Sequence, residues 1–330
     1  MRMQIEIVTP APAGSTAGNR ITAERWAKIF RELGHRVSIS PRQERRSGDV
    51  LIALHARRSY ASIVKFRRHH PQARIVLALT GTDVYRDIRR NRWARESLAL
   101  ADRIVVLQPN ALRELSAAER KKTRVIYQSA GSFPHLKKPA RRSVGDYFDI
   151  CVVGHLRPVK DPFRAAIAAR RLPSGSRIRI IQVGRALTKK IERRALRETQ
   201  INQRYRWLGE LKHARAMRVM AQSQLCVISS RMEGGANVLG EAIMAGLPVL
   251  ASRIEGNVGI LHVNYPGLFP FGDTDELRRL LVRAETDPKF LNQLTRRIER
   301  LVPLFNPALE RQAWAYLLTE LRVREPLAEG

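Results

Sequence analysis

Short apolar runs alternate with amphipathic stretches along the whole chain. Ten of these runs have the length and the β-branched composition of strands. They are MQIEIV, RVSIS, DVLIAL, RIVLAL, RIVVL and RVIY in the first half, and FDICVV, RIRIIQV, QLCVIS and LPVLAS in the second. Strands that alternate with helices in this way are typical of βα units, so the pattern predicts an α/β protein with parallel sheets.

The stretch between the first two runs has a helical period. Trp26, Ile29, Phe30 and Leu33 recur at i, i+3, i+4 and i+7, which predicts a helix with one buried face. Gly34 follows directly and is expected to end this helix.

A break in the pattern divides the chain into two halves. Residues 129–147 mix Gly, Pro, Ser and basic residues without periodicity, as an interdomain linker does. With 330 residues, the chain has the length of two domains. We therefore expect two doubly wound, Rossmann-like domains that face a cleft. The expected parts are a first domain at 1–140, a linker at 141–147, a second domain at 148–305, and a C-terminal helix at 306–330 that packs back toward the first domain.

Charge and composition narrow the function classes. The chain has 60 basic and 30 acidic residues, a formal charge of +30. Such an excess attracts nucleic acid, acidic membranes or small anions. Only 6% of the residues are aromatic and no helix-turn-helix or zinc spacing is present, so no nucleic-acid partner is expected. Without a signal peptide or a long apolar run, a cytoplasmic location is expected. Cys151 and Cys226 lie in apolar runs and are expected to be small core residues.

The strongest chemical signal lies in residues 229–252, whose sequence is SSRMEGGANVLGEAIMAGLPVLAS. An apolar strand leads into adjacent glycines, and a helix begins directly after them. Backbone N–H groups of such a turn bind anions, and the helix N-terminus adds positive partial charge. The predicted anion-binding residues are Gly234, Gly235, Ala236, Asn237 and Val238. Carboxylates repel phosphate, so we expect Glu233 to bind the hydroxyls of a sugar and Glu241 those of a ribose.

Two glutamates with seven residues between them, across a glycine turn, resemble the retaining transferases of glycosyltransferase family GT4, which have the GT-B fold. Residues 154–160, GHLRPVK, are similar to the family's Gly-Arg-Leu-x-x-x-Lys. The resemblance implies that Lys160 stabilises the leaving diphosphate without a metal. His155 stands where the family has arginine, and either His155 or Arg157, two residues further on, is expected to take the place of that arginine. The family places its nucleobase beside Leu208 and Gly209.

Three loops of the first domain carry further candidates, all after predicted strands, where ligands of α/β sheets bind. The loop at 9–20 resembles the family's glycine-rich loop, with Gly14 and Gly18 toward the donor. Asp83 is expected to orient an acceptor or act as a base, or alternatively to cap the next segment. The expected acceptor-binding residues are Ser15, Thr16, Asn19, Arg20, His55, Arg57, Arg58 and Thr82.

Four strings of the first domain go beyond general family likeness. IVTPAPAGSTAGNRITAERWA, ALHARRS, LALTGTDVYRD and VIYQSAG together are similar to the selenosugar synthases of selenoneine biosynthesis. This resemblance implies transfer of N-acetylglucosamine, or glucose, from a UDP-sugar to selenophosphate. Glu233, Lys160, Arg157 and Asp83 are the residues expected at the reacting centre.

Several alternatives stay open. A transferase that acts on a lipid acceptor would dock on anionic membrane, but the apolar face of the helix at 21–33 is needed by its own sheet, so membrane contact is not expected. Asp273 and Asp275 form an Asp-x-Asp triplet that holds metal in other transferases. Here the triplet precedes a helix, and capping is the expected role. No metal and no cofactor are predicted, and the sequence gives no oligomeric state.

Overall fold

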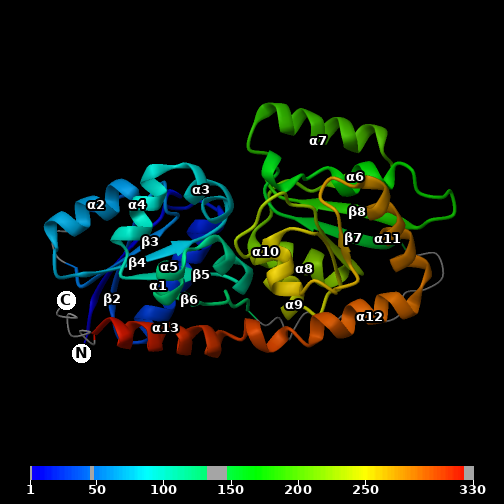
Figure 1. Ribbon diagram of the computed structural model, residues 1–330. Coiled ribbons are helices and arrows are strands. Elements are labelled where there is room, and N and C mark those ends of the chain that lie inside the picture. The colour runs from blue at the N-terminus through cyan, green and yellow to red at the C-terminus, as the bar shows by residue number, and fades with distance from the viewer. Residues whose placement is uncertain (1, 45–47, 132–146, 323–330) are drawn as a thin grey trace. The chain divides into compact units, whose positions relative to one another are not determined.

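The computed structural model describes residues 2–44, 48–131 and 147–322. Its contacts divide the chain into two compact units (Figure 1). Unit 1 comprises Met1–Gln128 and Pro307–Gly330, and unit 2 comprises Ser129–Asn306. Ala130 donates a backbone hydrogen bond to Phe305 of unit 2, so unit 1 ends before residue 140. The linker predicted at 141–147 lies outside the described residues except for Tyr147.

Unit 1 is built on a parallel sheet with the strand order β2-β1-β3-β4-β5-β6. All six strands that the apolar runs predict are present. They are β1 (Gln4–Val8), β2 (Arg36–Ser40), β3 (Val50–Leu54), β4 (Arg74–Leu79), β5 (Arg103–Val106) and β6 (Thr123–Val125). The helices are α1 (Gly18–Glu32), α2 (Tyr60–His69), α3 (Ile88–Arg90), α4 (Arg92–Leu100), α5 (Ala117–Lys121) and α13 (Pro307–Arg322), with short helical turns η1 (Asp83–Asp87) and η2 (Pro109–Glu114).

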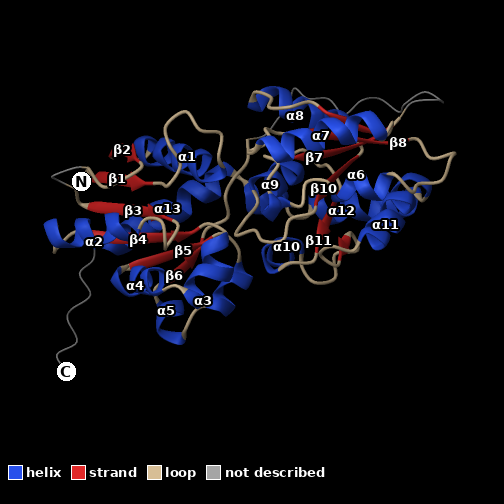
Figure 2. Ribbon diagram, turned by 90° about the horizontal axis from the view of Figure 1, so that it is seen from above, coloured by secondary structure: helices blue, strands red, loops and turns tan. Residues whose placement is uncertain are grey.

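Helices cover both faces of this sheet (Figure 2). One face packs against α1 and α13, and the other against α2 and α4. The predicted face of α1 is confirmed, since Trp26, Ile29 and Phe30 are buried and Gly34 follows with φ +87°. Trp314 of α13 packs edge-on against Trp26 at 4.7 Å between ring centroids. The C-terminal helix thus completes the core of unit 1.

Unit 2 repeats the architecture with the strand order β12-β11-β10-β7-β8-β9. The four predicted strands are β7 (Phe148–Val153), β8 (Ile178–Val183), β10 (Leu225–Ile228) and β11 (Val249–Ser252). The pattern missed β9 (Tyr205–Trp207) and β12 (Leu268–Phe269), which have three and two residues. The helices are α6 (Arg164–Ala169), α7 (Lys189–Ile201), α8 (His213–Gln222), α9 (Asn237–Met244), α10 (Glu255–Leu261), α11 (Thr274–Thr286) and α12 (Pro288–Glu299), with turns η3 (Pro158–Lys160) and η4 (Val302–Phe305).

Two local predictions in unit 2 are confirmed. Cys151 and Cys226 are free, fully buried partners on the neighbouring strands β7 and β10. Asp273 caps α11, accepting a hydrogen bond from the backbone N–H of Glu276 at 2.8 Å, while Asp275 pairs with Arg278.

Candidate functional site

In unit 2, the loops that follow β7 and β10 lie at the same edge of the sheet, because all strands are parallel. The first loop holds Gly154–Lys160, and the second holds the glycine turn (residues 233–238) that leads into α9. A backbone hydrogen bond of 2.8 Å from Arg231 to Val159 joins the two loops. The two segments singled out in the sequence, about 75 residues apart, therefore meet as one site.

Lys160 and Glu233 form the centre of this site. Lys160 Nζ lies 2.5 Å from Glu233 Oε1, and the glutamate is 8% exposed. Ser229 fixes the backbone at Lys160, since its hydroxyl donates to the carbonyl oxygens of Lys160 and Asp161. Lys160 and Glu233, which are predicted to bind the diphosphate and the sugar of a donor, thus neutralise each other in this structure. A ligand with a phosphate for the lysine and a hydroxyl for the glutamate can replace this contact.

The glycine turn ends at the N-terminus of α9. Ala236 is the N-cap residue and has extended backbone angles. Its methyl group accepts no hydrogen bond, so the N-cap side chain leaves the first N–H groups of α9 uncapped. The first N–H groups of α9 therefore present positive partial charge at the edge that also holds Lys160. Gly256 backs this turn, because a Cβ there would lie 1.9 Å from the carbonyl oxygen of Glu233. This close approach fixes where Glu233 sits.

Glu241 lies further along α9 and is mostly buried. Its Oε1 atom lies 3.0 Å from Nε2 of His213, the first residue of α8. Sequence reasoning missed His213, whose only signal was its place just after the predicted nucleobase residues. Of these, Leu208 is 44% exposed and Gly209 has φ +68°.

The two replacements considered for the family arginine differ in exposure. Arg157 is exposed at the start of η3, with an extended backbone, whereas His155 is half-buried. Both lie on the loop that carries Lys160, so Arg157 is the one with a solvent-accessible charge.

In unit 1, the candidate loops follow β1, β3 and β4. Gly14 adopts φ +73° in the loop after β1, together with Ser15 and Thr16. Gly18, Asn19 and Arg20 form the first turn of α1 instead of a loop. The charge of Arg20 is engaged by Glu24, one turn further on, at 2.6 Å.

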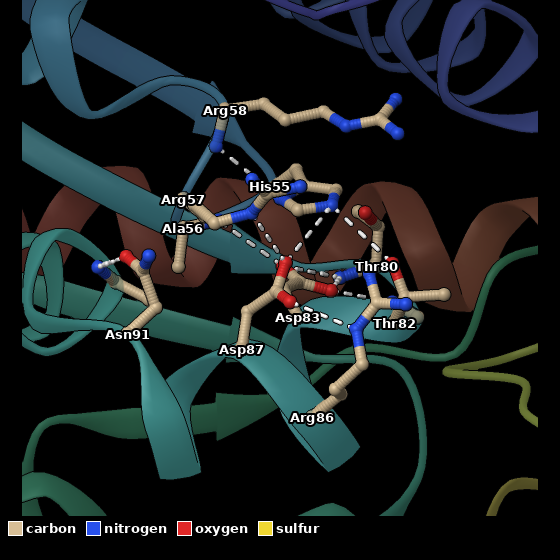
Figure 3. Close-up of polar contacts among 12 residues, drawn as sticks. His55, Ala56, Arg57, Arg58, Thr80, Thr82, Asp83, Arg86, Asp87 and Asn91 are labelled. Atoms are coloured by element: carbon tan, nitrogen blue, oxygen red, sulfur yellow. Dashed lines mark hydrogen bonds and ion pairs between the residues drawn. The ribbon is translucent and has the colours of Figure 1, made fainter.

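His55 follows β3 directly and has an unusual conformation (Figure 3). Its φ of +78° is rare for a residue with a side chain, and the ring is almost fully buried. Nδ1 accepts a hydrogen bond from the backbone N–H of Arg58, so the neutral ring carries its proton on Nε2. That atom lies 3.4 Å from Thr82 Oγ1 and 3.8 Å from Asp87 Oδ2. Burial lowers the pKa of His55, although Asp83 and Asp87 act in the opposite direction.

The carboxylate of Asp83 binds backbone N–H groups. Asp83 is fully buried, and its carboxylate accepts hydrogen bonds from the N–H groups of Ala56, Thr80 and Gly81 at 3.1, 3.1 and 2.8 Å. All three donors precede Asp83 in the chain, and η1 has no side-chain cap, so Asp83 does not cap the segment that follows it; its carboxylate binds the loop backbone. Asp83 ties the end of β3 to the end of β4 and so positions His55.

Asp87 is the residue of this cluster that sequence reasoning missed. It accepts hydrogen bonds from Arg57 and Arg86, both at 3.0 Å. Burial alone raises the pKa of the Asp87 carboxyl, but the two guanidinium groups outweigh it and hold this pKa below its usual value. Arg57 is therefore occupied, whereas Arg58 is exposed and points away from both carboxylates in Figure 3.

The model of the family "Glycosyl transferases group 1" matches residues 136–300, half of the chain. The chain belongs to this family. The match covers every element of unit 2 that forms the Lys160–Glu233 site. No curated protein sequence matches this glycosyltransferase.

Solved structures resemble the glycosyltransferase over nearly its whole length. HepE from Anabaena in complex with UDP and glucose has a TM-score of 0.72 at 16% identity, covering 97% of this chain and 100% of that one. Sucrose-phosphate synthase from Thermosynechococcus elongatus has a TM-score of 0.77 at 17% identity, with 97% and 99% covered. A glycosyltransferase from Rickettsia africae scores 0.70 at 12% identity, with 98% and 100% covered. The GT-B fold is thereby confirmed.

Across 2–44, 48–131 and 147–322, no group of three His, Cys, Asp or Glu side chains is placed to hold a metal ion. Over the same residues, no helix combines the length and the apolarity needed to cross a bilayer. The role of Lys160 in place of a metal stays a prediction.

Proposed function

We propose that this glycosyltransferase transfers N-acetylglucosamine from a UDP-sugar to selenophosphate and makes a 1-selenosugar for selenoneine biosynthesis. The donor half is carried by one observation, the Lys160–Glu233 pair at the open N-terminus of α9. A sugar diphosphate offers both residues a better partner, namely phosphate for the lysine and hydroxyls for the glutamate. HepE, which shares the fold, has been solved with UDP and glucose and supports a uridine nucleotide.

The acceptor half rests on unit 1. The four strings that resemble selenosugar synthases include the loops after β1, β3 and β4. The loop after β3 presents Arg58 beside the buried His55, and a guanidinium binds a phosphoryl group in bidentate fashion. Such a site suits a small, multiply charged anion.

The chemistry balances without a protein nucleophile. The ionised selenium attacks the anomeric carbon, a C–Se bond forms, and the C–O bond to UDP breaks with its electron pair leaving on the diphosphate. Lys160 and the N–H groups of the glycine turn hold that departing charge. Water then cleaves the Se–P bond, which releases phosphate and leaves the selenol of the sugar.

The test is incubation of the pure protein with UDP-N-acetylglucosamine or UDP-glucose, with and without selenophosphate. We expect UDP and phosphate to appear in equal amounts only when selenophosphate is present, together with a selenosugar detected by mass spectrometry. Arg296→Ala, an exposed change on α12, serves as the control that should behave like the wild type. UDP release with a lipid acceptor but not with selenophosphate would show that the acceptor half is wrong.

A further inference from the structure

The contact between Glu241 and His213 joins two elements that the sequence does not connect. Glu241 is in α9 and His213 begins α8, 28 residues earlier. The glutamate side chain is 12% exposed and the histidine side chain is 59% exposed. An ionised carboxylate only accepts hydrogen bonds, so the 3.0 Å contact requires a proton on Nε2 of His213.

A mostly buried carboxylate needs a donor that fixes its orientation, because desolvation without one is costly. His213 supplies that donor from the solvent side of Glu241, and it leaves the second carboxylate oxygen for another partner. The loop just before His213 carries Leu208, exposed, and Gly209, in a left-handed conformation. Leu208 and Gly209, the predicted nucleobase residues, thus precede His213 by five and four residues in one short connection between β9 and α8.

We propose that His213 is a positioning residue that holds Glu241 toward the ribose diol of the donor. This inference rests on the proposed UDP-sugar donor. Through this contact the pair sets a preference for nucleoside diphosphates that keep both the 2′- and 3′-hydroxyl groups. A histidine that only neutralised Glu241 for the sake of the fold would stabilise the protein without affecting this preference.

The two roles are separated by combining protein variants with a ligand analogue. UDP and 2′,3′-dideoxy-UDP are titrated calorimetrically into the wild type, His213→Leu, His213→Gln and Glu241→Gln. We expect His213→Leu to weaken UDP about tenfold, the size of one lost charge-assisted hydrogen bond, and to leave dideoxy-UDP unchanged. His213→Gln keeps an N–H donor of similar reach and should restore most of the UDP affinity. Arg218→Ala, exposed on the same helix, is the matched control.

Each result decides the matter. Equal weakening of both nucleotides by His213→Leu, or no weakening of either, would overturn the positioning role. If His213→Leu does not fold, His213→Gln alone decides, since it must discriminate the two nucleotides as the wild type does. A wild type that binds neither nucleotide would instead contradict the proposed donor.

Discussion

At the residue scale, the ion pair between Lys160 and Glu233 fixes both side chains at the candidate site. Each partner is more than three-quarters buried, so their contact is screened little by solvent and keeps both charges satisfied without a ligand. Under the proposed function, a sugar diphosphate would replace this contact with two new ones, from phosphate to Lys160 and from hydroxyl to Glu233. The exchange costs little, because neither charge is left alone in the bound state.

Replacing Lys160 by Met should remove the cation that we propose to stabilise the leaving diphosphate. Loss of one such group lowers kcat by about 100- to 1000-fold. We expect the KM for the UDP-sugar to change much less, since the amides of the glycine turn remain. Steady-state kinetics with saturating acceptor measure both constants, and a variant with wild-type kcat would exclude Lys160 from the leaving-group role.

Arg57 and Arg58 are adjacent but should respond differently to replacement by Ala. Arg58→Ala should raise the KM for selenophosphate about tenfold, the size of one charge-assisted contact, and leave the UDP-sugar KM unchanged. Arg57→Ala removes a donor from the buried Asp87 and should mainly lower the thermal unfolding temperature. Kinetics and thermal unfolding on both variants check this, and the reverse assignment would mean that Arg57 binds the acceptor.

The stability of unit 1 should depend on pH through His55. Burial, together with Arg58 and Arg57, lowers the pKa of His55 below 6.5, and Asp83 and Asp87 offset this only in part. The unfolded chain therefore binds the proton more tightly than the folded chain. This contribution to stability is complete above pH 6.5 and is lost as the pH falls through 6.5 toward the folded pKa.

The variant His55→Asn tests this pH dependence, because asparagine tolerates a positive φ and does not titrate. We expect urea unfolding to show a smaller loss of stability between about pH 7 and pH 5 in the variant than in the wild type. His35, whose pKa burial also lowers, stays in both proteins, so only the difference between them reports on His55. Parallel pH curves would contradict the prediction.

At the scale of elements, α10 acts as a support for the glycine turn. Gly256 approaches Glu233 so closely that an added Cβ would also lie 2.7 Å from the glutamate's carbonyl carbon. Backbone atoms cannot rotate away as a side-chain tip does, so the turn or the helix must shift.

Gly256→Ala should therefore destabilise unit 2 by about 1–3 kcal/mol and lower activity, because Glu233 moves with the turn. Gly175→Ala is the matched control, since a Cβ at residue 175 meets nothing within 4 Å. Chemical denaturation and UDP release measure the two effects. Equal behaviour of both variants would mean that α10 does not fix the position of Glu233.

At the scale of the whole molecule, α13 completes the core that α1 and the sheet of unit 1 form, across 284 residues of sequence. Glu310 of α13 accepts a hydrogen bond of 2.8 Å from Trp26 Nε1 of α1, and Trp314 also packs edge-on against Phe30. Unit 1 thus reaches its final core only when α13 has packed against α1.

Trp314→Ala should cost about 3–5 kcal/mol of stability, because it opens a cavity between α1 and α13. Tyr316→Ala, two residues away and 64% exposed, should cost less than about 0.5 kcal/mol. Denaturant unfolding of the two variants checks the difference. A small loss for Trp314→Ala would show that α13 contributes little to the core of unit 1.

The sequence by itself determined ten of the twelve strands in the two described sheets, the buried face of α1 and the cap of α11. Each depends on residues within one element, since alternation or helical period sets which face is buried. The glycine turn after β10 was recognisable for the same reason, because φ requirements and helix N-termini are local properties.

Only the tertiary structure decided which side chains meet. Lys160 pairs with Glu233 across 73 residues, and His213 pairs with Glu241 across 28. The structure likewise assigned Asp83 to the backbone and placed Asp87 between two arginines. A periodic pattern predicts that one face of an element is buried, but it does not predict which other element covers that face. The partner is set by the strand order of each sheet, which brings loops distant in sequence to one edge.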